Sequence, residues 1–139
     1  MPTPPDDVLL NKGAIIERCI RRIREEYHAC PALDNFTHVD ALTLNIERAC
    51  QAAVDMAMHL VAKGHLGIPQ SAADAFSLLD RSALIDPSLA RSMRAMVGFR
   101  NIAIHQYEDL DPAILQKIAS SCLYDWVAFC AALGVKIAP

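Results

Sequence analysis

The stretch NFTHVDALTLNIERACQAAVDMAMHLVAKG, residues 35–64, decides the fold class of this chain. Its apolar residues recur every three to four positions, which is the spacing of one face of an α-helix. Thr37, with Asp40 three residues later, resembles a capping pair at the start, and Gly64 ends the helix. The sequence therefore predicts a long helix that needs partners to cover one apolar stripe, made of Val39, Leu42, Ile46, Ala49, Ala53, Met56 and Leu60.

The residues before and after this stretch predict two of its partners. Asp6 or Asp7 can cap a helix that continues to about Cys30, where a proline stops it. Ser71, followed by Asp74, begins a short helix. Both segments carry apolar residues at helical spacing, so we expect them to pack against residues 35–64.

Two Asp-Pro pairs, at residues 86–87 and 111–112, each place a cap before a proline at the first helical position. They open two more long helices, the second of which runs to about Leu133 before a glycine ends it. Strand-like alternation is absent from the sequence. We therefore expect an all-α fold, an antiparallel bundle of four long helices and one short helix, with residues 1–139 as a single domain.

Composition and charge exclude several classes of protein. Hydrophobic residues make up 53% of the 139 residues and charged residues 21%, which favours a helical globule over a disordered chain. The apolar runs are too short for a membrane span, and the start MPTPPDD has no secretory signal pattern, so we expect a cytoplasmic protein. A net charge of -3 argues against binding nucleic acid by overall electrostatics. No C-x-x-C pair occurs, so buried reduced thiols are expected at Cys19, Cys30, Cys50, Cys122 and Cys130.

A second stretch, VGFRNIAIHQYED at residues 97–109, places Arg100, His105 and Tyr107 within two turns of a predicted helix. At about 100° per residue, Tyr107 lies roughly 20° from Arg100 around the helix axis, whereas His105 lies roughly 140° away. Acidic residues and a proline follow, so the helix is expected to end near His105. Arg100 and His105 can converge if the helix frays, if long side chains curl inward, or if a second copy of the helix supplies the missing half.

These side chains suit chemistry on an RNA phosphodiester. Arg100 offers a rigid fork of donors for phosphate oxygens, and His105 can take or give a proton near neutral pH. RNA carries its own nucleophile in the 2′-hydroxyl, so no metal ion or other cofactor would be required. Taken alone, however, the same residues are more often a helix-end cation, a surface histidine and an amphipathic tyrosine. Spacing alone therefore permits a catalytic site without establishing one.

The segment RNIAIHQY resembles the Arg-x4-His-x-Tyr signature of the HepT-like branch of the HEPN superfamily. The segments ERACQAAVDMAMHLVA, PQSAADAFSLLD, LIDPSLARSMRAMVGFRN and YEDLDPAIL also resemble that family, so the likeness covers nearly the whole chain. The resemblance implies an all-helical, homodimeric ribonuclease toxin of a type VII-like toxin-antitoxin system. Its partner would be a minimal nucleotidyltransferase antitoxin, with which it would form a hetero-oligomer.

The resemblance also implies a role for each motif residue. Arg100 would bind and polarise the scissile phosphate, and His105 would act as general base or acid. Asn101 would orient one of them, in a cleft where two protomers meet. Tyr107 would be adenylylated from ATP by the antitoxin, and the added AMP would pair with Arg100 and block the RNA phosphate.

Two other functions remain open at this point. The chain could be a non-catalytic helical subunit that binds a nucleotide or supplies Tyr107 as the acceptor for a nucleotidyltransferase. It could also be a purely structural dimer module, in which Arg100 and His105 carry no function. RNA cleavage by the isolated chain separates the first reading from these two.

The remaining polar and aromatic residues favour structural roles. No metal site is expected from His28, His38, His59 and His65, because no pair has ligand spacing. Arg94 could extend a phosphate track from Arg100, although an exposed helical face explains it equally well. The carboxylates of Glu17, Glu47 and Asp55 could form salt bridges to the helix of residues 87–105, and Glu47 and Asp55 could instead serve an interface with a partner. Core positions are expected for Tyr124, Trp126 and Phe129.

Overall fold

The computed structural model describes residues 4–105 and 111–139, and this part of the chain is built of helices and loops without a strand. The prediction of an all-α fold is confirmed. No helix within these residues is long and apolar enough to cross a membrane. The elements in chain order are α1 (Asp7–Ala29), α2 (Phe36–Lys63), α3 (Ala72–Arg81), α4 (Pro87–His105), α5 (Pro112–Lys117), the π-helix η2 (Ile118–Cys122) and α6 (Leu123–Ala132).

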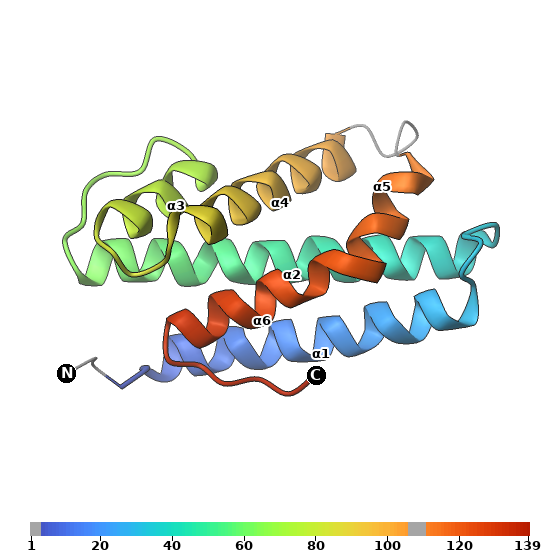
Figure 1. The fold of residues 1–139 in the computed structure, drawn as a ribbon, viewed down its shortest axis with the longest axis horizontal. Coiled ribbons are helices and arrows are strands. Elements are labelled where there is room, and N and C mark those ends of the chain that lie inside the picture. Colours follow the sequence, from blue (N-terminus) through green and yellow to red (C-terminus); the bar gives the residue numbers. More distant parts are fainter. Residues whose placement is uncertain (1–3, 106–110) are drawn as a thin grey trace.

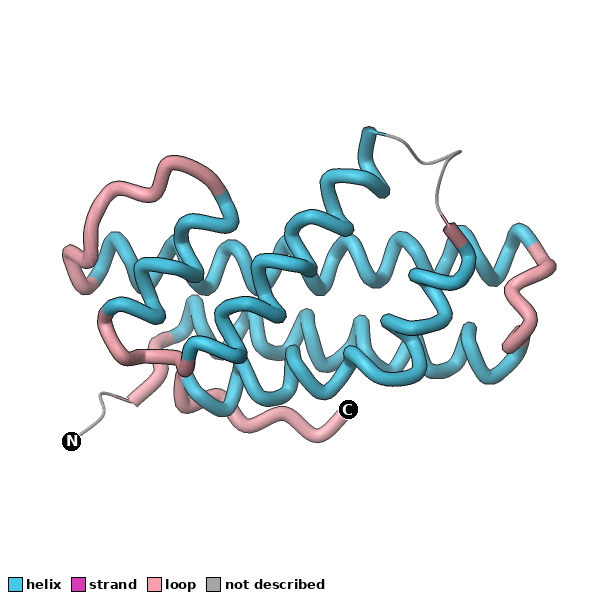
Figure 2. Tube along the Cα trace, turned by 45° about the horizontal axis from the view of Figure 1, so that its top comes forward, coloured by secondary structure: helices cyan, strands magenta, loops and turns pink. Residues whose placement is uncertain are grey.

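Helix α2 lies at the centre of the bundle (Figure 1). Helix α1 runs antiparallel to it along most of its length, and α3 and α4 pack on the other side. Helix α6 crosses beside α1 and also contacts α2 and α4, so it closes the core (Figure 2). The buried residues form one cluster that extends from Leu9 to Ile137. The apolar stripe predicted for residues 35–64 is therefore covered from several sides.

The helices begin at side-chain caps. Asp6 accepts from the backbone N–H of Leu9 at 3.0 Å, and Asp86 accepts from Leu89 at 2.7 Å. Asp111 likewise caps α5. The predicted cap of α2 was wrong: Asn35, in an extended conformation, accepts from the N–H of Thr37 at 2.9 Å. Helix α2 therefore begins before Thr37, which lies inside its first turn.

The last long helix departs from the prediction at η2. Residues 112–132 are helical throughout, but a π-helical turn separates α5 from α6. The hydroxyl of Ser121, inside this turn, donates to the carbonyl oxygen of Lys117 at 2.8 Å. A side chain that bonds the helix carbonyls competes with the regular backbone ladder, which accounts for a wider turn at this place.

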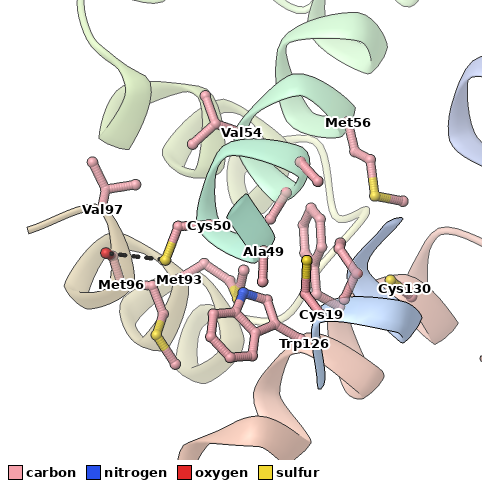
Figure 3. Close-up of a cluster of buried hydrophobic side chains, with 14 of the residues drawn as sticks. Cys19, Ala49, Cys50, Val54, Met56, Met93, Met96, Val97, Trp126 and Cys130 are labelled. Atoms are coloured by element: carbon pink, nitrogen blue, oxygen red, sulfur yellow. Dashed lines mark hydrogen bonds between the residues drawn. The ribbon is translucent and has the colours of Figure 1, made fainter. Parts of the chain in front are cut away.

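Aromatic and sulfur-containing side chains fill the centre of the core (Figure 3). Trp126 and Phe129 are fully buried, as predicted, and the ring of Phe129 meets that of Phe76 edge to face at 5.4 Å. Tyr124 was predicted to join them, and this was wrong, because its side chain is 75% exposed. Tyr124 and Trp126 both belong to α6 and stand about 200° apart around its axis, so the burial of Trp126 places Tyr124 on the opposite, exposed face.

All five cysteines are free thiols, and all except Cys122 are buried. The thiol of Cys50 donates to the carbonyl oxygen of Met96 at 3.5 Å, across the contact between α2 and α4 (Figure 3). Burial raises the pKa of both Cys50 and Cys130 to about 12. These two thiols therefore stay protonated at neutral pH and serve as packing groups.

Candidate functional site

Arg100 lies on the second half of α4, at the edge of the contact between α4 and α2. Buried residues on the same helix, including Val97, Phe99 and Ala103, anchor this part of α4 in the core. The Nη1 group of Arg100 donates to Oε1 of Gln51 on α2 at 2.8 Å, and its Nη2 group donates to Oδ1 of Asn101 at 2.9 Å. The guanidinium is thus held at both ends of its fork.

The two hydrogen bonds of Arg100 leave some N–H groups of its guanidinium unused. Its Nε atom is buried and has no hydrogen-bond partner among the described residues. Each terminal nitrogen carries two N–H groups and uses one of them on a neighbouring amide oxygen. Both of these partners are neutral, so neither cancels the positive charge. The fork can therefore still offer charge and N–H groups to an anion such as a phosphate.

The structure brings together two of the four residues predicted for the site. Asn101 was expected to orient either Arg100 or His105, and its oxygen accepts a hydrogen bond from Arg100. His105 is the last residue of α4, and its side chain lies outside the part that the structure describes. Tyr107 also falls outside the described residues. The predicted gathering of Arg100, His105 and Tyr107 therefore stays a prediction.

Gln51 is a site residue that the sequence analysis missed. It is exposed on α2, and its amide nitrogen donates to Oδ1 of Asp55 one turn later at 2.9 Å. That spacing is visible in the sequence, but the contact with Arg100 joins residues separated by 49 positions. Glu47, one turn before Gln51 on α2, is partly buried, and this burial raises the pKa of its carboxyl group.

An exposed stripe runs along α4 on the side away from α2. Its members, spaced three or four residues apart, are Arg91, Ala95, Gly98 and Ile102. A Cβ atom added at Gly98 would meet no heavy atom within 4 Å, so the backbone is open here. The helical position of His105, seven residues after Gly98, falls within about 20° of the same line. Arg100 and His105 therefore occupy different sides of α4, as the spacing indicated.

The predicted salt bridges to α4 were wrong for two of the three carboxylates. Asp55 pairs with Lys12 of α1 at 3.1 Å, and Glu17 accepts from the backbone N–H of Ala138 at 2.7 Å. Asp55 is therefore paired between α2 and α1, whereas Glu17, itself on α1, binds the C-terminal segment and Arg21. Arg94 donates to the hydroxyl of Ser77 on α3 at 3.4 Å, so it takes part in the packing of α3 on α4.

Two of the described histidines, His38 and His59, are held in pairs with carboxylates. Asp6 binds both Nε2 of His59, at 2.6 Å, and Nζ of Lys63, at 2.9 Å, while His38 contacts Glu26. No cluster of three or more metal-binding side chains occurs within residues 4–103 and 111–139. These contacts connect helix ends and the loops beside them.

Comparison with known proteins identifies relatives over most of the chain. The sequence model of the family described as HepT-like, Ribonuclease HepT-like, matches residues 16–133. The mRNA nuclease HepT of Shewanella oneidensis is 39% identical over 125 residues, which cover 89% of this chain and 94% of that protein.

Solved structures show the same fold. A crystal structure of a toxin-antitoxin with AMP-PNP contains a chain with a TM-score of 0.88 and 37% identity, covering 92% of this chain and 98% of that one. The tri-AMPylated HEPN toxin of Shewanella oneidensis, in complex with MNT antitoxin, also gives a TM-score of 0.88, with 38% identity. That match covers 93% of this chain and 98% of the toxin chain.

Proposed function

The chain belongs to the ribonuclease HepT-like family, and from this membership we propose that it cuts RNA with Arg100 and His105 as the toxin of a toxin-antitoxin pair. The observation that carries the site is the Arg100 guanidinium, held by two neutral amides and still able to offer N–H groups to a phosphate. The proposed compartment is the cytoplasm, where RNA and ATP are both present. The whole chain, residues 1–139, acts as one domain in this proposal.

Cleavage follows from the chemistry of the two motif side chains. Arg100 binds the non-bridging oxygens of the scissile phosphate and stabilises the charge that grows on them. His105, neutral at first, takes the proton of the ribose 2′-hydroxyl, whose oxygen forms a bond to phosphorus. The bond from phosphorus to the 5′-oxygen breaks, and a protonated histidine returns a proton to that oxygen. The products are a 2′,3′-cyclic phosphate and a 5′-hydroxyl, and no metal ion takes part.

The proposed active unit is a homodimer. Arg100 faces α2, whereas the position of His105 falls on the exposed stripe of α4 that contains Ala95, Gly98 and Ile102. A second copy of α4 on this stripe would bring the His105 of each protomer near the dimer axis and close to an Arg100. The open backbone at Gly98 suits such a close approach of two helices.

Tyr107 is the proposed off switch. The similar toxin of Shewanella oneidensis is tri-AMPylated and bound to MNT antitoxin. We expect a cognate minimal nucleotidyltransferase to attach AMP from ATP to Tyr107 and to form a hetero-oligomer with the chain. Tyr107 follows Arg100 by seven residues in the sequence, and we expect the added phosphates to compete with RNA for the guanidinium.

Cleavage of RNA by the purified chain in EDTA tests the proposal directly. We expect Arg100→Ala and His105→Ala each to lower the cleavage rate by roughly a hundredfold or more. Full activity in either variant would remove that residue from the mechanism. If the unchanged chain cuts no RNA but gains the mass of AMP on Tyr107 when a nucleotidyltransferase and ATP are added, it is an acceptor subunit instead.

The dimer is tested at Gly98. Gly98→Arg places a long charged side chain on the exposed stripe, so we expect a monomer in sedimentation and loss of RNA cleavage. Ala14→Arg is the matched control, because Ala14 is exposed on α1, a helix that lies on the other side of α2 from α4 (Figure 1). A monomeric Gly98→Arg variant with full cleavage would contradict a site shared between two copies.

A further inference from the structure

Gln51 ties Arg100 of α4 to helix α2. The two residues are 2.8 Å apart between Nη1 of the arginine and Oε1 of the glutamine. A guanidinium has donors and no acceptor, so the amide of Gln51 must present its oxygen to Arg100. The nitrogen of the same amide is then available on the other side.

Asp55 accepts a hydrogen bond from the amide nitrogen of Gln51. Nε2 of Gln51 donates to Oδ1 of Asp55 at 2.9 Å, one turn further along α2. A carboxylate accepts hydrogen bonds and does not donate them, so Asp55 fixes the same amide orientation that Arg100 requires. The amide of Gln51 is therefore oriented from both ends.

Lys12 completes the row of contacts from a third helix. Its Nζ lies 3.1 Å from Oδ2 of Asp55, and both side chains are about one-third exposed. The ammonium of Lys12 balances the carboxylate of Asp55, so the row adds no net negative charge beside Arg100. It runs from α1 through α2 to α4 and links the position of the guanidinium to the bundle itself.

We propose that Gln51 is a positioning residue for the ribonuclease, and that Asp55 and Lys12 hold its amide in the orientation that Arg100 needs. The chemistry of this inference rests on the proposed function, whereas the contacts that carry it belong to the free chain. The Nε atom of Arg100 has no partner among the described residues, so its terminal nitrogens set the plane of the guanidinium. Without Gln51, the hydrogen bond to Asn101, a residue of the same helix, is what remains to hold the fork.

A double-mutant cycle tests the coupling between Gln51 and Arg100. Gln51→Leu keeps the bulk of the side chain and removes both hydrogen bonds. We expect its single-turnover cleavage rate to fall roughly tenfold, with a change of less than about twofold in the Kd for RNA carrying a 2′-deoxyribose at the cut. In the Arg100→Ala background, Gln51→Leu should cause no further loss.

The cycle has a matched control in Gln70→Leu. Gln70 is an exposed glutamine in the loop before α3, where its side chain donates to the carbonyl oxygen of Ile68 at 3.4 Å, and its replacement should leave cleavage unchanged. A rate for Gln51→Leu equal to that of the unchanged chain would overturn the proposal. So would equal losses from Gln51→Leu with and without Arg100, because a residue that acts through the arginine cannot act in its absence.

Asp55 offers a test by conservative replacement. Asp55→Ala removes the acceptor for the Gln51 amide, and we expect cleavage to slow about threefold to fivefold. Asp55→Asn retains an oxygen that can accept from Gln51, so its rate should lie closer to that of the unchanged chain. Equal rates for the two variants would exclude Asp55 from the orientation of the amide.

Rotation of the Arg100 guanidinium, measured by NMR on the free chain, separates this inference from the proposed function. Gln51→Leu should speed the rotation about the bond between Nε and Cζ, and the Arg100→Lys variant assigns the signal. If the chain cuts no RNA but the Arg100 guanidinium still rotates slowly in a way that depends on Gln51, the ribonuclease mechanism is wrong and the positioning role of Gln51 is supported. If the chain cuts RNA but the rotation rate of the Arg100 guanidinium is the same with and without Gln51, the mechanism is supported and the positioning role of Gln51 is wrong.

Discussion

Two arginines of this chain are held through both terminal nitrogens, but the partners differ in charge. Arg22 on α1 donates to the carboxylates of Glu25 and Glu26, the latter at 2.7 Å. Arg100 on α4 donates to the amide oxygens of Gln51 and Asn101. The same fork is therefore neutralised on α1 and left charged on α4.

The difference separates a structural arginine from one that is available to a ligand. The hydrogen bonds that Arg22 donates to Glu25 and Glu26 raise the pKa of Arg22 and make its charge part of a closed cluster. A phosphate approaching Arg22 would have to compete with two carboxylates and would be repelled by them. At Arg100 it would meet two amide dipoles and unused N–H groups. Sequence composition cannot show this, because both residues are simply arginines on amphipathic helices.

Replacement of each arginine by lysine should give the largest contrast. Lysine keeps the charge but cannot hold two amides and a phosphate with one planar fork. We expect Arg100→Lys to lower single-turnover RNA cleavage about a hundredfold. Arg22→Lys should leave the cleavage rate unchanged, because its cluster lies on α1 and serves stability. A similar loss in both variants would show that the two clusters do not differ in function.

Gln51→Glu makes the environment of Arg100 resemble that of Arg22. The new carboxylate would pair with the guanidinium and compete with the RNA phosphate, while it would keep an oxygen close to where the amide oxygen stood. We expect cleavage at neutral pH to slow roughly tenfold, with the melting temperature unchanged or slightly raised. Faster cleavage than in the unchanged chain would mean that the charge of Arg100 does not need to be free.

The helix caps and the core follow from local sequence, whereas the hydrogen bond between Arg100 and Gln51 does not. Asp86 and Asp111 begin helices because each bonds the backbone two or three residues ahead, which the sequence displays directly. Trp126 is buried as its helical spacing predicts, whereas Tyr124, two residues earlier on the same helix, lies about 200° away around the axis and is exposed. The π-helical turn η2 was not predicted, because the hydroxyl contacts of Ser120 and Ser121 with the carbonyl oxygen of Lys117 leave no mark in a periodic pattern.

Within the described residues, Arg100 makes one contact that the sequence could predict and one that it could not. Arg100 and Asn101 are neighbours, so their contact is within reach of sequence reasoning. The contact between Arg100 and Gln51 depends on the relative register of α4 and α2, which is set by packing of the whole core. Asp55 was assigned to α4 by charge alone, yet its cation is Lys12 on α1. Charge predicts that a carboxylate will pair, and the fold decides with which residue.

Glu26→Gln tests the structural role of the cluster formed by Arg22, Glu25 and Glu26 on α1. His38, and then Arg22, lower the pKa of Glu26 below its ordinary value of 4.5 by bonding the charged form. Loss of that charge should destabilise the fold by about 1 kcal/mol, or roughly 3–5 °C in Tm, without changing RNA cleavage. A carboxyl group with a lowered pKa contributes its stability above the ordinary pKa and loses it as the pH falls through the lowered one.

Chemical denaturation at several pH values measures this contribution. The difference in unfolding free energy between the unchanged chain and Glu26→Gln should be constant near neutral pH and shrink once the pH falls below about 4.5. Glu25→Gln is the matched control, since the side chain of Glu25 is 61% exposed against 13% for Glu26. A larger loss from Glu25→Gln than from Glu26→Gln would contradict the assignment of the cluster.

The smallest expected effect is on the salt dependence of RNA binding. A cation that contacts a phosphate displaces a counterion, which adds about 0.7 to the slope of log Kd against log salt for a single strand. Arg100→Gln should therefore lower the slope by about that amount, or roughly threefold in affinity between 50 and 200 mM salt. Arg22→Gln should leave the slope unchanged, because its carboxylates already take the place of counterions. Equal slopes for Arg100→Gln and the unchanged chain would mean that Arg100 meets no phosphate in the bound state, and its free charge would then need another ligand.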